Sequence, residues 1–260
     1  MLKVRVIPTL LWKQFGLVKG VGFDSWRRVG PVLPAVKVYN RREVDELILV
    51  DIVAHQSDGD PDFESIDEFG QDCFVPLTVG GGIRRIEQVQ RLLRAGADKV
   101  SVNTAAYERP GLIEEIARRH GVQCVVASID VHQDGERGWR CFSHAGTTDT
   151  GKNVVAWARE LQDRGAGELL VTSIDRDGTM QGYDLALIEA VVKAVDIPVI
   201  ASGGAGKYQH MIDAVKQAGA SAVAAASMFH FTEQTPAEAK LAMANAGIPV
   251  RIPFKESIHR

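Results

Sequence analysis

The chain has 260 residues, of which 45% are hydrophobic and 24% are charged, and its formal net charge is −3. The composition is that of an ordinary globular protein, and the mild negative charge argues against non-specific nucleic-acid binding. No apolar run reaches transmembrane length, so we expect neither a nucleic acid nor a membrane as partner. The start of the chain has no signal-peptide pattern. Cys73, Cys124 and Cys141 have neither metal nor disulfide spacing, so we expect a cytoplasmic protein with reduced thiols, no metal and no cofactor.

Strands and helices are predicted to alternate through the first half of the chain. The expected strands are 4–9, 47–52, 76–79 and 98–102. The expected helices are 31–43, 64–70 and 85–95. A long glycine-bearing segment from 10 to about 30 is assigned neither a strand nor a helix.

The second half repeats this order. Its expected strands are 122–129, 168–174, 198–201 and 222–226. Its expected helices are 110–120, 154–164, 185–195, 208–218 and 236–246, and residues 132–146 are expected to form a hairpin. Eight strands alternating with eight helices favour the α/β class and a single (β/α)8 TIM barrel over a doubly wound sheet.

An internal repeat supports a barrel built from two halves. The segment Pro76-Leu-Thr-Val-Gly-Gly-Gly-Ile83 returns 122 residues later as Pro198-Val-Ile-Ala-Ser-Gly-Gly-Ala-Gly206. At the same offset, Glu46-Leu-Ile-Leu-Val-Asp51 matches Glu168-Leu-Leu-Val-Thr-Ser173. We therefore expect one domain over residues 1–260, made of half-barrels at about 1–121 and 122–260.

The glycine pairs end two expected strands, and active sites of TIM barrels lie at the C-terminal ends of the strands. Backbone N–H groups of such turns, with a neighbouring hydroxyl, can hold phosphate. Two turns on opposite sides of one mouth would suit an elongated bisphosphate, unless the glycines only turn the chain. The candidate cradle residues are Gly81, Gly82, Asn103 and Thr104 on one side and Gly203, Gly204, Ala226 and Ser227 on the other.

Long segments of the chain resemble one family, the cyclase subunit of imidazole glycerol phosphate synthase (HisF), over essentially the whole length. The matching segments include residues 74–83, 96–106, 164–168, 172–179, 200–207 and 229–231. The resemblance implies a lyase of histidine biosynthesis that works with a glutaminase subunit. The glutaminase docks on the N-terminal face of the barrel, and its ammonia passes through the barrel to a bisphosphate substrate at the other end.

The resemblance also assigns roles to charged residues. Positions of the family's ammonia gate match Arg5, Glu46, Lys99 and Glu168, and a glutaminase-interface position matches Asp98. All four gate positions lie at or near strand starts, where a barrel core is normally apolar. Two acids and two bases can pair there, so an ion-pair ring that only stabilises the barrel remains the alternative.

The family's chemistry uses two carboxylates as general acid and base, one ending strand 1 and one ending strand 5. The second is Asp130, but Leu11 occupies the position of the first. Since removal of a general acid or base costs roughly 10²–10⁴ in rate, cyclase activity is in doubt. Further matches at the mouth, expected to contact substrate, are Lys19, Asp51, Thr172, Asp177 and Gly178.

Three functions remain open at this point. The first is a synthase subunit with lyase and cyclase chemistry. The second is an ammonia-conducting subunit with little chemistry of its own, as in a HisF-like branch found with surface-polysaccharide genes, where a HisH-like glutaminase and this barrel would supply a sugar amidotransferase in lipopolysaccharide synthesis. The third, a sugar-phosphate isomerase of the related half-barrel family, is weaker, because it shares the need for the missing acid and would not need the gate.

Overall fold

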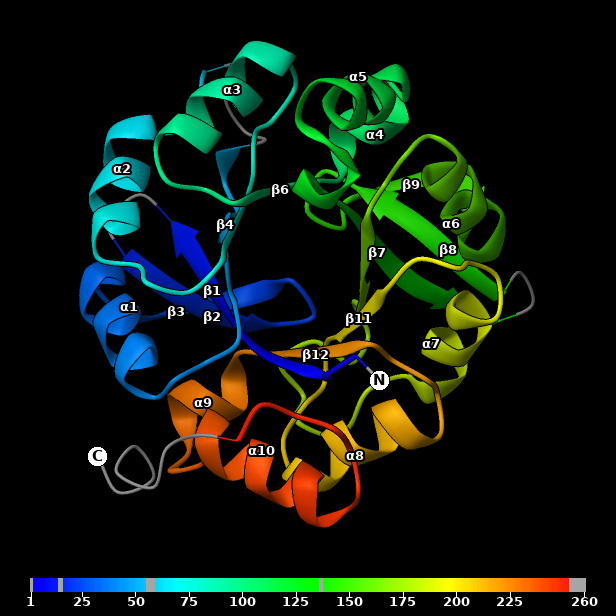
Figure 1. Cartoon of the computed structure of the whole chain (residues 1–260). Coiled ribbons are helices and arrows are strands. Elements are labelled where there is room, and N and C mark those ends of the chain that lie inside the picture. The colour runs from blue at the N-terminus through cyan, green and yellow to red at the C-terminus, as the bar shows by residue number, and fades with distance from the viewer. Residues whose placement is uncertain (1, 14–15, 55–58, 136–137, 253–260) are drawn as a thin grey trace.

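A computed structural model describes residues 2–13, 16–54, 59–135 and 138–252. Within these ranges, eight parallel strands close into a barrel whose helices form an outer ring (Figure 1). The barrel strands are β1 (Arg5–Lys13), β4 (Leu47–Asp51), β5 (Leu77–Gly80), β6 (Lys99–Val102), β7 (Val125–Asp134), β10 (Glu168–Ser173), β11 (Val199–Ser202) and β12 (Ala222–Ala225). Pairing of β10 with β7 and of β12 with β1 closes the circle, which confirms the predicted (β/α)8 TIM barrel.

The helices of the outer ring follow the barrel strands in the order that the sequence predicts. They are α1 (Val32–Arg41), α2 (Phe63–Gln71), α3 (Ile86–Arg94), α5 (Gly111–His120), α6 (Val154–Asp163), α7 (Leu185–Val192), α8 (Tyr208–Lys216) and α10 (Pro236–Asn245). Capping explains some of their ends: the side chain of Asn153 accepts from two backbone N–H groups at the start of α6, and Thr235 with Glu238 forms a capping box on α10. No helix in the described ranges is long and apolar enough to cross a membrane.

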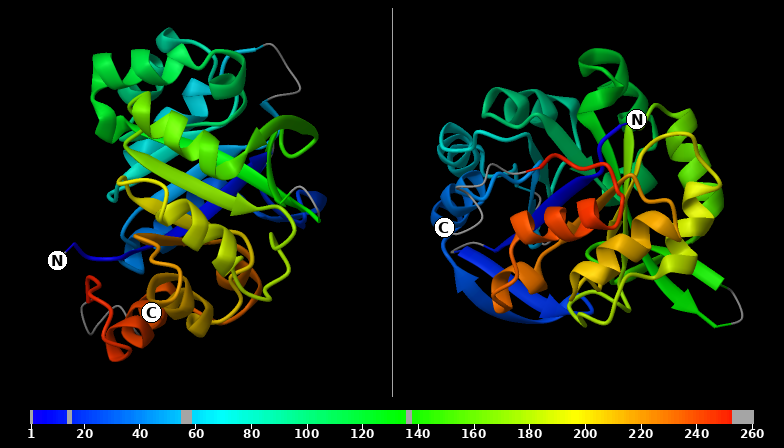
Figure 2. Two further views of the ribbon diagram at one scale, coloured as in Figure 1. Left: turned by 90° about the vertical axis from the view of Figure 1, so that its right-hand side faces the viewer. Right: turned by 60° about the horizontal axis from the view of Figure 1, so that its bottom comes forward.

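Two antiparallel additions were only partly predicted. The glycine-bearing segment, to which the sequence assigned no element, contains a hairpin, β2 (Gly16–Val21) and β3 (Asp24–Gly30), which continues from β1. The hairpin expected at 132–146 is larger, because β7 extends to Asp134 and pairs with β8 (Gly138–Ser143), which pairs with β9 (Thr148–Asn153). In side view, β8 and β9 lie at the end of the barrel opposite the N-terminus (Figure 2, left).

Short elements at the ends of three strands also differ from the prediction. A 3₁₀ turn, η2 (Val122–Cys124), occupies the residues expected to open β7. Two five-residue helices, α4 (Thr104–Glu108) and α9 (Ser227–Phe231), begin directly after β6 and β12. Both were missed because a single helical turn has no apolar periodicity to detect.

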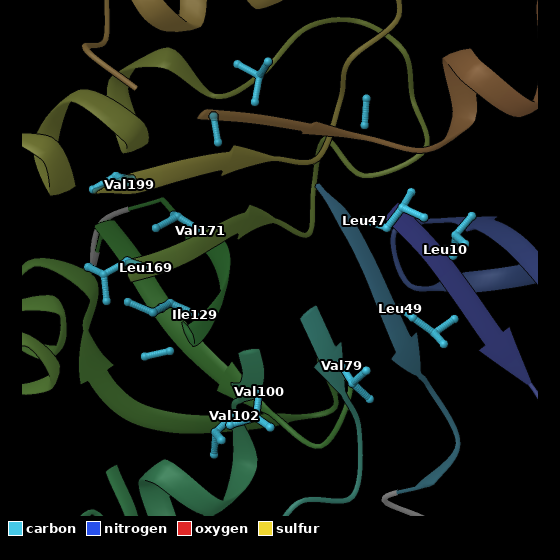
Figure 3. Packing of buried hydrophobic residues seen from close by; sticks show 14 of the residues in the cluster. Leu10, Leu47, Leu49, Val79, Val100, Val102, Ile129, Leu169, Val171 and Val199 are labelled. Atoms are coloured by element: carbon cyan, nitrogen blue, oxygen red, sulfur yellow. The ribbon is translucent and has the colours of Figure 1, made fainter. Parts of the chain in front are cut away.

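Alternation along the strands divides the core into two parts. Residues such as Leu10, Leu49 and Val100 pack between the strands and the helices, and Figure 3 shows ten labelled side chains of this outer layer. The other faces of the strands fill the barrel interior with a separate buried cluster: Ile7, Ile48, Val126, Leu170, Ile200, Ala222 and Ala224. This two-residue period decides which side chains face the interior and its two ends.

Candidate functional site

A cavity of about 470 Å³ opens at the C-terminal ends of the barrel strands. Alternation within β1 aims Thr9 and Leu11 into it, while Leu10 and Trp12 are buried in the outer layer. A shift of one residue would exchange these two faces, so the position of Leu11 at the mouth is fixed by the buried Leu10 and Trp12. Every mouth residue predicted from the sequence lines this cavity: Leu11, Lys19, Asp51, Gly81, Gly82, Asn103, Thr104, Asp130, Thr172, Asp177, Gly178, Gly203, Gly204, Ala226 and Ser227.

The two glycine pairs occupy backbone conformations that other residues rarely adopt. Gly81 has a φ of +104°, and a Cβ there would lie 2.2 Å from the carbonyl oxygen of Asp51. Gly203 has a φ of +86°, and its Cβ would lie 2.6 Å from the carbonyl oxygen of Ser173. Asp51 and Ser173 are themselves 122 positions apart in the chain, the offset of the internal repeat. The glycines are therefore required by close backbone approach on both sides of the mouth.

Asp130 projects from β7 into the cavity. Its Oδ2 accepts a hydrogen bond from Asn103 Nδ2 at 2.9 Å. Burial, followed by the negative charge of Asp177, raises the pKa of Asp130 from 3.8 to about 7. A carboxyl with this pKa can both donate and accept a proton near neutral pH.

The raised pKa predicts a pH-dependent gain in stability for Asp130→Asn. The unfolded chain releases this proton near pH 3.8 and the folded chain near pH 7, so the native carboxyl lowers stability progressively over that interval, and its cost is fully present above pH 7. We expect the free energy of unfolding of the variant to exceed that of the native protein by about 2 kcal/mol at about pH 8 and to be nearly the same at about pH 4. The figure of about 2 kcal/mol is roughly half of what the full pKa shift would give, because the carboxyl faces an open cavity that water can enter. Urea denaturation at both pH values measures this, and an equal gain at both would contradict it.

Lys19 and Asp177 form an ion pair at the mouth. Lys19 is only 3% exposed, and its Nζ lies 2.8 and 2.9 Å from the two carboxylate oxygens of Asp177. The N–H of Gly22 donates to the carbonyl oxygen of Asp177, and a Cβ on Gly178 would lie 2.2 Å from the carbonyl oxygen of Gly20. The hairpin β2–β3 is therefore held against the loop after β10, and the charge of Lys19 is already matched within the chain.

Asp51 has a local role as well as a place in the cavity. Its Oδ1 accepts from the backbone N–H groups of Val53 and Ala54 at 2.9 and 3.1 Å. These bonds fix the turn after β4 against which Gly81 packs. A contact of Asp51 with a ligand in the cavity would therefore be made beside these two backbone hydrogen bonds.

Sequence reasoning missed further side chains that line the cavity, among them Phe23, Trp26, Arg84 and His144. Phe23 and Trp26 belong to the hairpin β2–β3, which the sequence did not predict. Arg84 follows the first glycine turn, and His144 lies in the turn between β8 and β9. Their positions depend on tertiary packing, although an arginine two residues after a glycine pair is a signal that could have been followed.

Four charged side chains form a ring at the opposite end of the barrel, where the strands begin. Arg5 lies 2.7 Å from Glu46 and 2.9 Å from Glu168, and Lys99 lies 3.0 Å from Glu46 and 3.2 Å from Glu168. The other carboxylate oxygen of Glu46 accepts from Thr78 Oγ1 at 2.7 Å. Each acid thus pairs with both bases, which offsets the cost of burying the charges.

Asp98 lies on the outer surface at the same end. Its side chain is exposed at the start of β6, and its Oδ2 accepts from the backbone N–H of Leu77 at 2.8 Å. Between the ring and the cavity lies the apolar interior cluster, which includes Ile7, Ile48 and Leu170. The barrel axis therefore runs from a ring of paired charges through an apolar layer into a polar mouth.

Comparisons with known proteins agree with this arrangement. The family described as "Histidine biosynthesis protein" matches residues 5–235. Imidazole glycerol phosphate synthase subunit HisF of Caulobacter vibrioides is 50% identical over 254 residues, with 97% of each chain covered. The subunit HisF of Gluconacetobacter diazotrophicus is 46% identical over 251 residues, which cover 96% of this chain and 97% of the relative.

Proposed function

Because the chain belongs to the histidine biosynthesis protein family, with HisF subunits of imidazole glycerol phosphate synthase among its relatives, we propose that it is a HisF-type barrel subunit of a lyase. It receives ammonia from a HisH-like glutaminase at the N-terminal ends of its strands. The ammonia passes along the barrel axis to a phosphate-bearing ligand held between the two glycine turns. Arg5, Glu46, Lys99 and Glu168 act as the gate.

The charged ring is the observation that carries this proposal. Four ionisable side chains inside a barrel are costly to bury, and an apolar set could fill the same space at no such cost. In a ring where each charge has two partners, one ion pair can open while the other remains, so no charge is left unpaired. A closely packed apolar plug has no comparable way to open and close. Its location, at the far end from the cavity, is where a gate for incoming ammonia has to lie.

Exposed apolar side chains around the ring support docking of a partner there. Leu2 is 90% exposed, Phe74 is 81% exposed and Val122 is 52% exposed. Each lies three residues before the start of a barrel strand, so all three belong to the face that surrounds the ring. Exposed apolar groups gathered on one face are typical of an interaction site. Asp98 adds a carboxylate to the same face.

Phe74→Asp should weaken binding of a HisH-like glutaminase at least tenfold, because a central exposed aromatic residue commonly contributes 1–2 kcal/mol or more to an interface. Val21→Asp is the matched control, since Val21 is 53% exposed at the end of β2, in the hairpin that lies at the mouth of the barrel. Affinity is measured by titration calorimetry with the purified glutaminase. The docking proposal fails if native barrel and glutaminase do not associate, or if both variants bind equally well.

A second candidate is favoured by one observation, the aim of Leu11 into the mouth. On the β1 side of the cavity, the inward side chains are those of Thr9 and Leu11, neither of which can replace a carboxylic acid in proton transfer. The subunit would then conduct ammonia with little chemistry of its own and supply a separate sugar amidotransferase of lipopolysaccharide or O-antigen synthesis. Neighbouring genes discriminate the two candidates: histidine genes favour the synthase, and sugar-modifying genes favour the conduit.

A further inference from the structure

His144 occupies a strained turn directly over the cavity. It has a φ of +51°, and the next residue, Ala145, has a φ of +53°. Both line the cavity, at the turn that joins β8 to β9. A left-handed conformation is unfavourable for a residue with a Cβ, so the surrounding structure has to hold it in place.

The backbone of His144 is hydrogen-bonded to the first cradle, the set of Gly81, Gly82, Asn103 and Thr104. Its N–H donates to Thr104 Oγ1 at 3.0 Å. Because the hydroxyl oxygen accepts this bond, its own proton remains to be donated elsewhere. Thr104 lines the cavity beside Asn103, so that proton is available to an oxygen of a ligand.

The imidazole ring is oriented by one firm contact and one loose contact. Its Nδ1 lies 3.0 Å from Ser143 Oγ, and its Nε2 lies 3.4 Å from Glu108 Oε1. Ser143 is 4% exposed and is not one of the described residues that line the cavity, so it orients the ring and cannot attack a ligand. The side chain of Glu108 is 56% exposed, and 3.4 Å is too long for a strong hydrogen bond, so this carboxylate can readily be displaced.

We propose that His144 is a ligand-contacting residue that completes the first cradle around a phosphate monoester. The Nε2–H group leaves Glu108 and donates to a phosphate oxygen, while the Thr104 hydroxyl donates to another. The phosphate thereby replaces Glu108 as the acceptor. This inference rests on the proposed function in one respect, namely that the mouth holds a phosphate-bearing ligand.

Two substitutions with opposite expected effects test the inference. His144→Asn removes the imidazole, keeps the backbone N–H to Thr104 and suits a left-handed turn, which asparagine tolerates. It should weaken binding of ribose 5-phosphate and of inorganic phosphate about tenfold, the effect of losing one hydrogen bond to a charged group. Glu108→Gln should strengthen binding of both probes about threefold, because a like charge is removed and the amide oxygen is a weaker competing acceptor than the carboxylate.

His132→Asn is the matched control. His132 is also a partly exposed histidine that pairs with a carboxylate, that of Asp175, and it does not belong to the described cavity lining. Affinities are measured by titration calorimetry, and thermal unfolding verifies that each variant is folded. The expected result is weaker binding by His144→Asn, tighter binding by Glu108→Gln and unchanged binding by His132→Asn.

Other results overturn the inference in distinguishable ways. If His144→Asn binds the probes as tightly as the native protein, or if both His144→Asn and Glu108→Gln bind them more weakly, the pair of His144 and Glu108 only supports the turn. The proposal that the mouth binds phosphate is then unaffected. Failure of the native protein to bind either probe removes the phosphate-bearing mouth itself, and with it both the inference and that part of the proposed function.

Discussion

Leu11→Asp should raise turnover of the family's bisphosphate substrate, assayed with an ammonium salt, by about 10²-fold over the native chain. The substitution places a second carboxyl on the β1 side of the cavity that already contains Asp130 on β7. A general acid or base contributes roughly 10²–10⁴ in rate, and the lower end is expected because the native mouth is packed around a leucine. The ammonium assay bypasses the glutaminase, so the comparison reports the chemistry at the mouth alone.

Leu11→Asn provides the control for polarity without proton transfer. It has nearly the size of aspartate and should leave turnover at the native level. The relative from Caulobacter vibrioides, which is named as subunit HisF of imidazole glycerol phosphate synthase, serves as the reference. A native rate equal to that of this reference would contradict the argument from Leu11 and favour the synthase over the conduit.

The barrel could be predicted because its signals are local and repeated. Most of the short apolar strands end at or just before a glycine or a polar residue, and the twofold repeat places Gly81 and Gly203 at equivalent strand ends. Strand alternation then determines which residues reach the mouth. The charged ring was inferred from family positions, with charged residues at strand starts as the physical support.

The details of the mouth depend on contacts that no local pattern encodes. Lys19 and Asp177 are 158 positions apart and meet only because the hairpin β2–β3 folds onto the loop after β10. The tip of that hairpin needs left-handed conformations at Phe23 and Ser25, which are unfavourable for both residue types and were not predicted. His144 reaches the cavity by a similar turn, so the residues missed are those whose placement is decided by tertiary packing.

Glu46→Gln should lower the free energy of unfolding by about 3 kcal/mol, the typical cost of breaking a buried ion pair by removing one partner. Glu46 is 2% exposed and contacts both Arg5 and Lys99, so its neutralisation leaves two cations to share Glu168. Glu160→Gln is the control, because Glu160 also pairs with two cations, Lys152 and Arg164, but these pairs are about one third exposed and should contribute only about 1 kcal/mol. Urea denaturation measures both variants, and equal small losses would contradict a coupled buried ring.

The same variant separates a gate from a ring that only stabilises the barrel. On the proposed ammonia path, turnover with glutamine in the complex with the glutaminase depends on passage through the ring, whereas turnover with ammonium salt at the open mouth does not. If the ring is the gate, Glu46→Gln should reduce the ratio of glutamine-dependent to ammonium-dependent product formation several-fold, because the unbalanced cations alter passage at this point. A loss of stability with an unchanged ratio would assign the ring a structural role and remove the observation on which the ammonia path depends.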